Sequence, residues 1–137
     1  MAGSRTLTII KPDAFGASNA GKILAHLEAQ GFVLRAARVT HLSTTDAQKF
    51  YEVHKDRGFF GELVEFMTSG PCMPLVLEKA DAVAALRVAI GSTDPAEAAD
   101  GTVRKLFTES KGRNAIHASD SDENAAVESA FFFPGLT

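Results

Sequence analysis

The amino-acid sequence predicts one α/β domain, residues 1–137, in which helices pack on a small β-sheet. A chain of 137 residues is long enough to bury one substantial core. Its composition, 45% apolar and 23% charged, is typical of a globular protein. Strand-like and helix-like periodicities alternate in the order β-α-β-α-α-β-α, followed by a long polar segment, a helix and a final strand. This order fits a ferredoxin-like sandwich or a small doubly wound sheet, and periodicity does not choose between them.

The first elements are a strand, a helix and a second strand. Residues 5–11 (RTLTIIK) are β-branched and alternate in polarity, so we expect a strand that Pro12 ends. A helix is expected from about Asn19 to Gly31, because glycine commonly stops a helix. Its apolar face consists of Ile23, Leu24 and Leu27. Residues 32–42 (FVLRAARVTHL) have the composition of the second strand.

The middle of the chain is mainly helical. The STTD stretch at 43–46 has a hydroxyl followed three residues later by an acid, which is a helix-start signature. That helix should continue through His54, and a second helix should cover residues 60–69. Residues 72–79 (CMPLVLEK) form the expected third strand, and a helix follows over 81–90.

The last third begins with a polar segment. It runs from Gly91 to Ser121 and is rich in turn residues, and segments of this kind are usually functional or disordered. Residues 120–133 (DSDENAAVESAFFF) carry acids at their start and an alanine-rich apolar face after it. We therefore expect a closing helix there.

Charge and cysteine usage exclude several classes of function. The net charge of −3 argues against broad nucleic-acid binding, which needs a basic face. Cys72 is the only cysteine, so no internal disulfide can form. The N-terminus lacks the pattern of a signal peptide and no stretch is apolar enough to span a membrane. We expect a cytoplasmic protein with no membrane partner.

The stretch GASNAGKI at 16–23 is one residue short of a phosphate-binding P-loop. A P-loop needs a strand that ends at its first glycine, whereas here four residues separate Lys11 from Gly16. It also needs a hydroxyl after the lysine, and Ile23 has none. The stretch is therefore interpreted as a turn into the first helix.

His117 is the strongest candidate for chemistry among the four histidines. His26 and His54 fall in expected helices and His41 closes a strand. His117 lies just before a helix N-terminus, where free N–H groups favour anions. A neutral imidazole has a lone pair that can attack phosphorus without a separate base. Without further information, a histidine that only caps the helix remains the simpler interpretation.

Four segments together resemble nucleoside diphosphate kinase. They are IIKPDA (9–14), FYEVHKDRGFFGELVEFMTSGP (50–71), GSTDPAEAADGTVR (91–104) and NAIHASDS (114–121). The likeness runs from about Arg5 to Phe133 in the family's order and spacing. It implies a ferredoxin-like sandwich with a four-stranded antiparallel sheet. It also implies transfer of the γ-phosphate of a nucleoside triphosphate to a nucleoside diphosphate through a phosphohistidine, in a ping-pong cycle.

The resemblance implies a role for each matched residue. His117 is the nucleophile, and Ser119 and Glu128 support it. Lys11 contacts the transferred phosphoryl group, and Tyr51 lies beside the histidine and the lysine. Arg87, Thr93 and Arg104 hold the remaining phosphates. Phe59 stacks on the base, and Asn114 bonds the ribose hydroxyl.

The family resemblance also implies a cofactor and partners. The cofactor is Mg²⁺, held largely by the nucleotide's own oxygens, with Asp120 as the nearest protein group. The expected ligands are nucleoside tri- and diphosphates such as ATP, GTP and ADP. An aromatic side chain stacks on any base, so we expect little base specificity. Relatives assemble as dimers that form tetramers or hexamers, which predicts a homo-oligomer here.

Taken singly, several of these residues have ordinary explanations. Lys11 could be a solvated lysine at a strand end. Tyr51 and Phe59 could be core aromatics. Arg104 could pair with a nearby acid of its own segment. Only the combination, in the family's spacing, favours the functional interpretation.

The rival function is a non-catalytic nucleotide sensor or scaffolding module of the same fold. An intact His117 argues against it. Ala118 and Asp100 depart from the family pattern where glycine and proline, respectively, are common. Two further departures are Gly58, which stands where proline is common, and Lys111, which stands where an aliphatic residue often faces the base. Both bear on nucleotide affinity.

Overall fold

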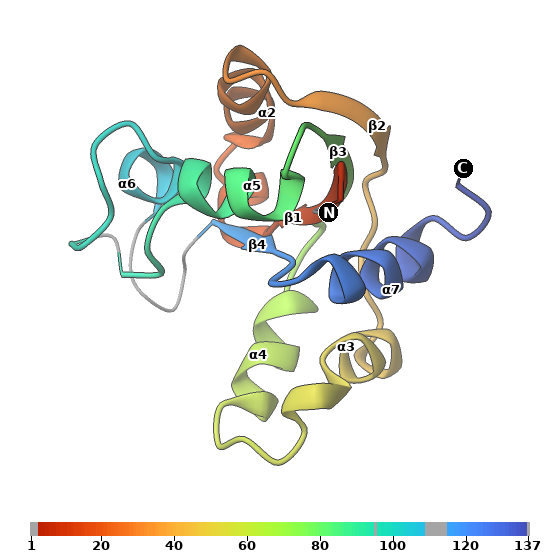
Figure 1. Ribbon diagram of the computed structural model, residues 1–137. Coiled ribbons are helices and arrows are strands. Elements are labelled where there is room, and N and C mark those ends of the chain that lie inside the picture. Colours follow the sequence, from red (N-terminus) through yellow and green to blue (C-terminus); the bar gives the residue numbers. More distant parts are fainter. Residues whose placement is uncertain (1–2, 95, 109–114, 137) are drawn as a thin grey trace.

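A four-stranded antiparallel sheet with helices on both faces forms the centre of the molecule (Figure 1). The computed structural model describes residues 3–94, 96–108 and 115–136. The strands are β1 (Arg5–Ile10), β2 (Val33–Ala37), β3 (Met73–Glu78) and β4 (Ile116–Ala118), in the spatial order β2-β3-β1-β4. Every neighbouring pair is antiparallel. The ferredoxin-like prediction is therefore confirmed, and the doubly wound alternative, which requires a parallel sheet, is excluded.

Helices occupy most of the connections between strands. They are α1 (Pro12–Gly16), α2 (Ala20–Ala29), α3 (Thr44–Phe50), α4 (Phe60–Met67), α5 (Ala82–Ile90), α6 (Val103–Phe107) and α7 (Asp122–Phe132), with a 3₁₀ turn at Glu52–His54. The predicted start of α3 is confirmed, because Ser43 Oγ accepts a hydrogen bond from Asp46 N at 3.1 Å. Ser121 caps α7 in the same way through Asn124 N.

The sheet is buried on both faces, which gives two core clusters. Ile10, Leu75 and Leu77 pack against α2 and α5 on one face. Leu7, Ile9 and Val76 pack against α4 and α7 on the other. Burial on both sides explains why β3 is apolar from Met73 to Leu77, and it leaves Thr6 and Thr8 of β1 fully buried.

Strand β2 forms an exposed edge of the sheet. The expected strand over 32–42 is shorter in the structure, where β2 covers only Val33–Ala37. Its pairing with β3 shifts between Leu34 and Ala36, an irregularity of the kind that bends a strand. Beyond Ala37 a single bridge between Thr40 and Cys72 continues the pairing.

One expectation for the polar parts of the chain is confirmed but incomplete, and two are wrong. β1 ends at Ile10, just before Pro12, as expected, and Pro12 also occupies the first position of α1, where its missing N–H costs nothing. The polar segment from Gly91 contains α6 and β4, neither of which was expected. The final strand expected after the closing helix is absent from residues 133–136, and its place in the sheet is taken by β4, which precedes that helix.

Helices α3 and α4 form a hairpin that projects from the body of the molecule, at the bottom of Figure 1. Gly58 lies in the turn between them, and a Cβ added there would meet no atom within 4 Å. Its φ lies outside the left-handed region, so alanine fits without strain.

We expect Gly58→Ala to raise the free energy of unfolding by about 0.4–1 kcal/mol, because it restricts only the unfolded chain. Urea denaturation of the two proteins measures this difference. A loss of stability would show that the turn needs a conformation specific to glycine.

Candidate functional site

The pairing of β4 with β1 brings His117 next to Lys11. Ile9 lies opposite His117 in the sheet, and the hydroxyl of Thr8 donates to His117 O at 2.5 Å. Lys11 follows the end of β1, and its backbone N donates to Ala115 O at 2.9 Å. Residues that are more than 100 positions apart in the sequence therefore share one end of two adjacent strands.

The imidazole of His117 has one nitrogen engaged and one available. Its Nε2 lies 2.9 Å from Glu128 Oε1, and the Ser119 hydroxyl donates to the same oxygen at 2.7 Å. Because an ionised carboxylate only accepts hydrogen bonds, the proton of the neutral ring is on Nε2. Nδ1 then carries the lone pair and can act as a nucleophile.

Two aromatic side chains of the hairpin hold the imidazole edgewise. The ring centroids of Phe50 and Tyr51 lie 5.6 Å and 6.1 Å from that of His117. Tyr51 is 5% exposed, and its hydroxyl is buried without a hydrogen-bond partner among the described residues. Burial raises the pKa of Tyr51, so the hydroxyl keeps its proton and remains a donor.

Lys11 is a buried cation. It is 8% exposed, whereas its position at a strand end alone would suggest a solvated lysine. Burial, and then the charge of Arg104, lower the pKa of Lys11 to about 8, with Asp13 acting in the opposite direction. An anion that binds beside Lys11 would stabilise its charged form.

Arg104 is 9% exposed and links three segments. Its Nη2 donates to Ile116 O at 2.7 Å and its Nη1 to Gly91 O at 3.2 Å, with Thr93 Oγ1 at 3.5 Å. Burial, and then the charge of Arg87, lower its pKa to about 10, so the guanidinium remains charged at neutral pH. The alternative pairing of Arg104 with a nearby acid is not among the ion pairs of the described residues.

Arg87 and Asp120 lie at the edge of this cluster. Arg87 Nη1 donates to Ala118 O at 3.4 Å. A hydrogen bond from Asn124 Nδ2 to Asp120 Oδ1, at 2.6 Å, is the main cause that lowers the pKa of Asp120. The charge of Arg87 lowers the pKa of Asp120 further. The three cations therefore lie close enough to influence one another and the groups around the imidazole.

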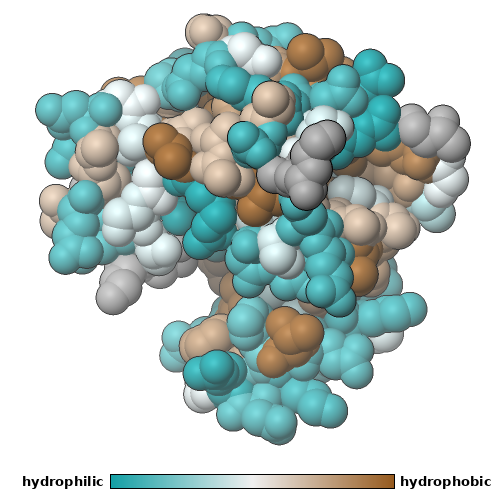
Figure 2. Space-filling view, in the orientation of Figure 1, coloured by the Kyte–Doolittle hydropathy of each residue, from teal (hydrophilic) through white to brown (hydrophobic). Residues whose placement is uncertain are grey.

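Phe59 lies at the turn of the α3–α4 hairpin, directly before α4. It is 49% exposed and its ring is 5.5 Å from that of His54. Figure 2 shows the surface indented between this hairpin and the body of the molecule. Asn114 and Lys111 lie outside the described residues, so their expected roles stay predictions.

Two residues of the site have roles that sequence reasoning missed. Asp13 Oδ2 accepts a hydrogen bond from Ala115 N at 2.9 Å, and Ala115 has a φ of 70°. This bond fixes the turn that leads into β4 and His117. Gly91, which ends α5, accepts from Arg104 through its carbonyl group. The motifs IIKPDA and GSTDP contain both residues, but their roles depend on contacts that spacing does not indicate.

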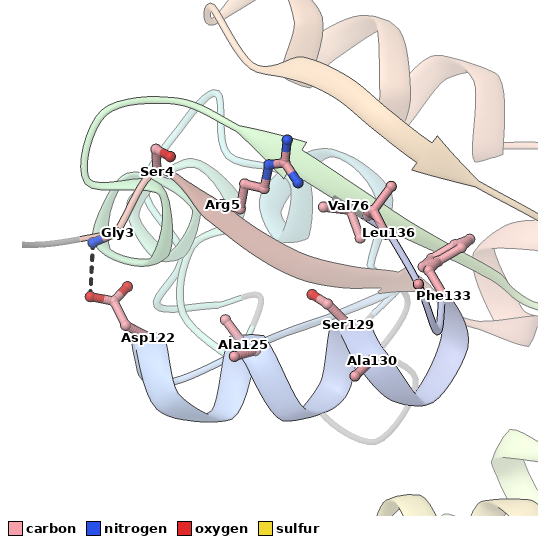
Figure 3. Close-up of a pocket in the computed structure, with 12 residues that line it drawn as sticks. Gly3, Ser4, Arg5, Val76, Asp122, Ala125, Ser129, Ala130, Phe133 and Leu136 are labelled. Carbon is pink, nitrogen blue, oxygen red and sulfur yellow. Dashed lines mark hydrogen bonds between the residues drawn. The ribbon is translucent and has the colours of Figure 1, made fainter.

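A cavity of about 410 Å³ lies elsewhere, between the start of β1 and α7 (Figure 3). Its walls include Arg5, Val76, Ala125 and Phe133, and a hydrogen bond from Gly3 N to Asp122 closes one end. None of the candidate site residues lines it. Among the described residues, no three His, Cys, Asp or Glu side chains gather as a metal site, and no helix is long and apolar enough to cross a membrane.

Comparison with known proteins identifies the family. The family model for nucleoside diphosphate kinase matches residues 4–136. The nucleoside diphosphate kinase of Chlorobium chlorochromatii is 57% identical over 129 residues, covering 94% of this chain and 92% of that protein. The enzyme of Flavobacterium psychrophilum is 51% identical, covering 98% and 97%.

Solved structures agree with the sequence comparison. The crystal structure of the Aquifex aeolicus nucleoside diphosphate kinase superimposes with a TM-score of 0.94 at 47% identity, covering 97% of this chain and 96% of that one. The Encephalitozoon cuniculi enzyme gives 0.91 at 34% identity, covering 96% and 89%. The chain therefore belongs to the nucleoside diphosphate kinase family.

Proposed function

We propose that His117 carries a phosphoryl group from the γ-position of a nucleoside triphosphate to a nucleoside diphosphate. Membership of the family makes the chain a phosphotransferase. The observation that carries the proposal is the hydrogen-bonded series Ser119–Glu128–His117, which leaves Nδ1 available beside the buried cation Lys11. The intact series gives no support to the rival, non-catalytic sensor or scaffold.

The reaction uses His117 twice, first as the nucleophile and then as the leaving group. The Nδ1 lone pair of His117 attacks the γ-phosphorus, and an N–P bond forms as the bond to the β–γ bridging oxygen breaks. The electron pair of that bond leaves with the diphosphate. The ring gains positive charge, which Glu128 stabilises through the Nε2–H hydrogen bond. In the second half, a terminal oxygen of another diphosphate attacks the same phosphorus. An O–P bond forms as the N–P bond breaks, and the electron pair of the N–P bond returns to Nδ1, which restores the free imidazole.

The cations hold the phosphates in line with Nδ1. Lys11 meets the transferred group, and Arg104, Arg87 and Thr93 meet the remaining phosphates. Phosphoryl transfer depends mainly on alignment and on stabilising charge on the equatorial oxygens. The hydroxyl of Tyr51, which has no partner among the described residues, is a donor for the transferred group. Bound phosphates also offset the burial and the neighbouring positive charges that lower the pKa of Lys11 and Arg104.

The base and sugar need fewer contacts. Phe59 is exposed enough to stack on a base, and any base has a suitable face. We assign the ribose hydroxyl to Asn114 from the family resemblance. Specificity for the base is therefore expected to be low.

Mg²⁺ fits the residues present as an ion shared with the substrate. Mg²⁺ dehydrates reluctantly and is usually bound by one or two carboxylates together with substrate phosphates. Asp120 is an exposed carboxylate whose lowered pKa keeps it ionised beside the cation cluster. When bound, the ion neutralises charge on the phosphate oxygens, and Asp120 is the side chain that would hold it.

We also propose a homo-oligomer in the cytoplasm. Strand β2 presents an unpaired edge with exposed Val33 and Leu34, which a second copy of the chain can cover. The single cysteine, Cys72, is buried and free, as suits a reducing compartment. Sedimentation at several concentrations measures the subunit number.

Labelling tests the proposed function directly. The protein is mixed with Mg²⁺ and ATP labelled at the γ-phosphate, then separated from nucleotide. We expect label on the chain that is stable in base and lost in acid, and that moves to any added nucleoside diphosphate. Absence of chain-bound label, with the nucleotide still bound, would favour the non-catalytic sensor.

The charge of Lys11 predicts a pH limit. Its pKa of about 8 lies below the ordinary 10.5, so the folded protein loses this charge over a range in which an exposed lysine keeps it. We expect kcat/KM for ATP to fall as the pH rises through about 8. The unfolded chain binds more protons between about 8 and 10.5, so the contribution of Lys11 to stability rises over the same range.

A matched variant separates Lys11 from other groups. Lys11→Arg keeps its charge throughout, so we expect a lower but pH-independent kcat/KM between pH 7.5 and 9.5. An alkaline decline of the same size in both proteins would assign the titration to another group.

A further inference from the structure

We propose that His26 is a positioning residue for phosphate binding. Its imidazole ties the segment Gly91–Arg104 to helix α2 and so fixes Arg104 and Thr93 for the nucleotide. The inference rests on the proposed function of that segment. His26 lies outside the motifs that carry the family resemblance.

The contact of His26 is directional. Its Nε2 lies 2.7 Å from Gly101 O. A carbonyl oxygen only accepts, so Nε2 carries the proton in the neutral ring as well as in the imidazolium. The amide nitrogen of Gln30, the C-cap residue of α2, lies 2.8 Å from the same ring nitrogen. Because the ring nitrogen has one hydrogen, which Gly101 O accepts, we assign this amide the other way round, with its oxygen facing the ring and sharing that hydrogen.

Gly101 lies at the point where the segment turns into α6. Its φ of 83° reverses the chain direction just before Thr102. Thr102 caps α6: its hydroxyl donates to Ala99 O at 2.7 Å and accepts from Lys105 N at 3.3 Å. Arg104 is in the first turn of this helix. Gly101, whose carbonyl group contacts His26, is therefore three residues before Arg104.

Contacts within the segment join its two ends. Arg104 reaches back to Gly91 O and Thr93 Oγ1. The side chain of Thr102 packs directly over Gly91, within 3 Å of where a Cβ would be. These contacts join four residues into one unit: Gly91, Thr93, Thr102 and Arg104. A displacement of Gly101 would therefore move all four.

This unit is held to the body from two sides. Arg104 Nη2 holds it to β4 through Ile116 O, and His26 holds it to α2. If the His26 bond is lost, the guanidinium of Arg104 must anchor the segment and also meet a phosphate. Binding of the diphosphate should weaken, because the loosened segment has to be ordered again on binding.

The experiment measures the Kd of ADP with Mg²⁺ by calorimetry. We expect His26→Ala to raise it about threefold to tenfold, the usual effect of one lost hydrogen bond. His26→Gln can donate from its amide and should restore the Kd to within about twofold. The rate at which saturating ATP phosphorylates His117 should change by less than about twofold in both variants, because neither alters Nδ1, Glu128 or Ser119.

The chain offers a matched control. His41 Nε2 makes the same kind of contact, 2.7 Å from Thr68 O, at the end of α4. His41→Ala should leave the Kd of ADP unchanged. In an Arg104→Met background, His26→Ala should change the Kd by less than about twofold, because the residue through which it acts is gone.

The outcomes separate this inference from the proposed function. If Arg104→Met weakens ADP binding but His26→Ala does not, or if His41→Ala weakens it equally, the role of His26 is overturned and the phosphate site stands. If His26→Gln binds ADP as weakly as His26→Ala, the hydrogen bond is not the cause and the inference also fails. If Arg104→Met binds ADP normally, the phosphate site itself is wrong and the inference falls with it.

Discussion

Replacing His117 with alanine is expected to abolish phosphotransfer while the fold stays intact. The substitution removes the only nitrogen that we assign as the phosphoryl carrier. Without it the rate of exchange between ATP and a diphosphate should fall on the order of 10⁴-fold or more, as when other covalent enzymes lose their nucleophile. No label should remain on the chain.

The stability of the protein should change little in the same variant. Strand β4 pairs with β1 through its backbone, which alanine keeps. Glu128 loses one hydrogen bond but still accepts from Ser119. A thermal midpoint within a few degrees of the unaltered protein, together with retained ADP binding, would assign the lost activity to chemistry. Base-stable label on the alanine variant would contradict the proposed carrier.

Glu128→Gln is the milder companion of this experiment. Glutamine still fits beside Nε2 but lacks the negative charge that stabilises the imidazolium. Hydrogen bonds to charged groups contribute about 1.5–3 kcal/mol, so we expect phosphorylation of His117 to slow about tenfold to a hundredfold. Single-turnover labelling measures the rate. An unchanged rate would limit Glu128 to a structural role.

Gly91→Ala is expected to destabilise the protein by at least about 2 kcal/mol and to weaken nucleotide binding. Gly91 has φ 87° and ψ −178°, a conformation that is essentially confined to glycine. An added Cβ would also lie 2.5 Å from Thr102 Oγ1 and 2.8 Å from Thr102 Cβ. Backbone strain and overpacking therefore act together.

The effect on binding follows from the carbonyl group of Gly91. It accepts from Arg104 Nη1, so a shift of Gly91 moves the guanidinium that we assign to phosphates. Urea denaturation and ADP titration measure the two effects. Gly101→Ala is the matched control, because Gly101 has a φ of 83° but nothing within 4 Å of an added Cβ. If Gly91→Ala is as stable as Gly101→Ala, then Thr102 moves aside at no cost and the expected overpacking is absent.

The closest agreement between sequence and structure lies in the long periodic elements and their caps. Helix α5 and strand β3 begin within one residue of the expected positions. The Ser43 cap is local chemistry that spacing reveals. Short elements escaped prediction for the same reason: α6 has five residues and β4 three, too few for a period to show.

The candidate site divides in a similar way. His117 stands out in the sequence because the motif around it is specific. The burial of Lys11 does not show in the sequence, because a lysine at a strand end is usually solvated. In the structure Lys11 is buried beside the turn at Ala115, which Asp13 holds by a hydrogen bond. His26 and Gly91 have no local signal, since their importance comes from contacts with residues 75 and 13 positions away.

Residue types at fixed spacing were enough to reveal the family likeness, the order of the major elements and His117 as the residue that we propose as nucleophile. The folded structure was needed to show which ring nitrogen of His117 is available, how deeply Lys11 and Arg104 are buried, and what holds the segment that we assign to phosphate binding. These properties depend on the distances between side chains from separate strands and helices. Such distances exist only once the antiparallel sheet has brought β4 against β1.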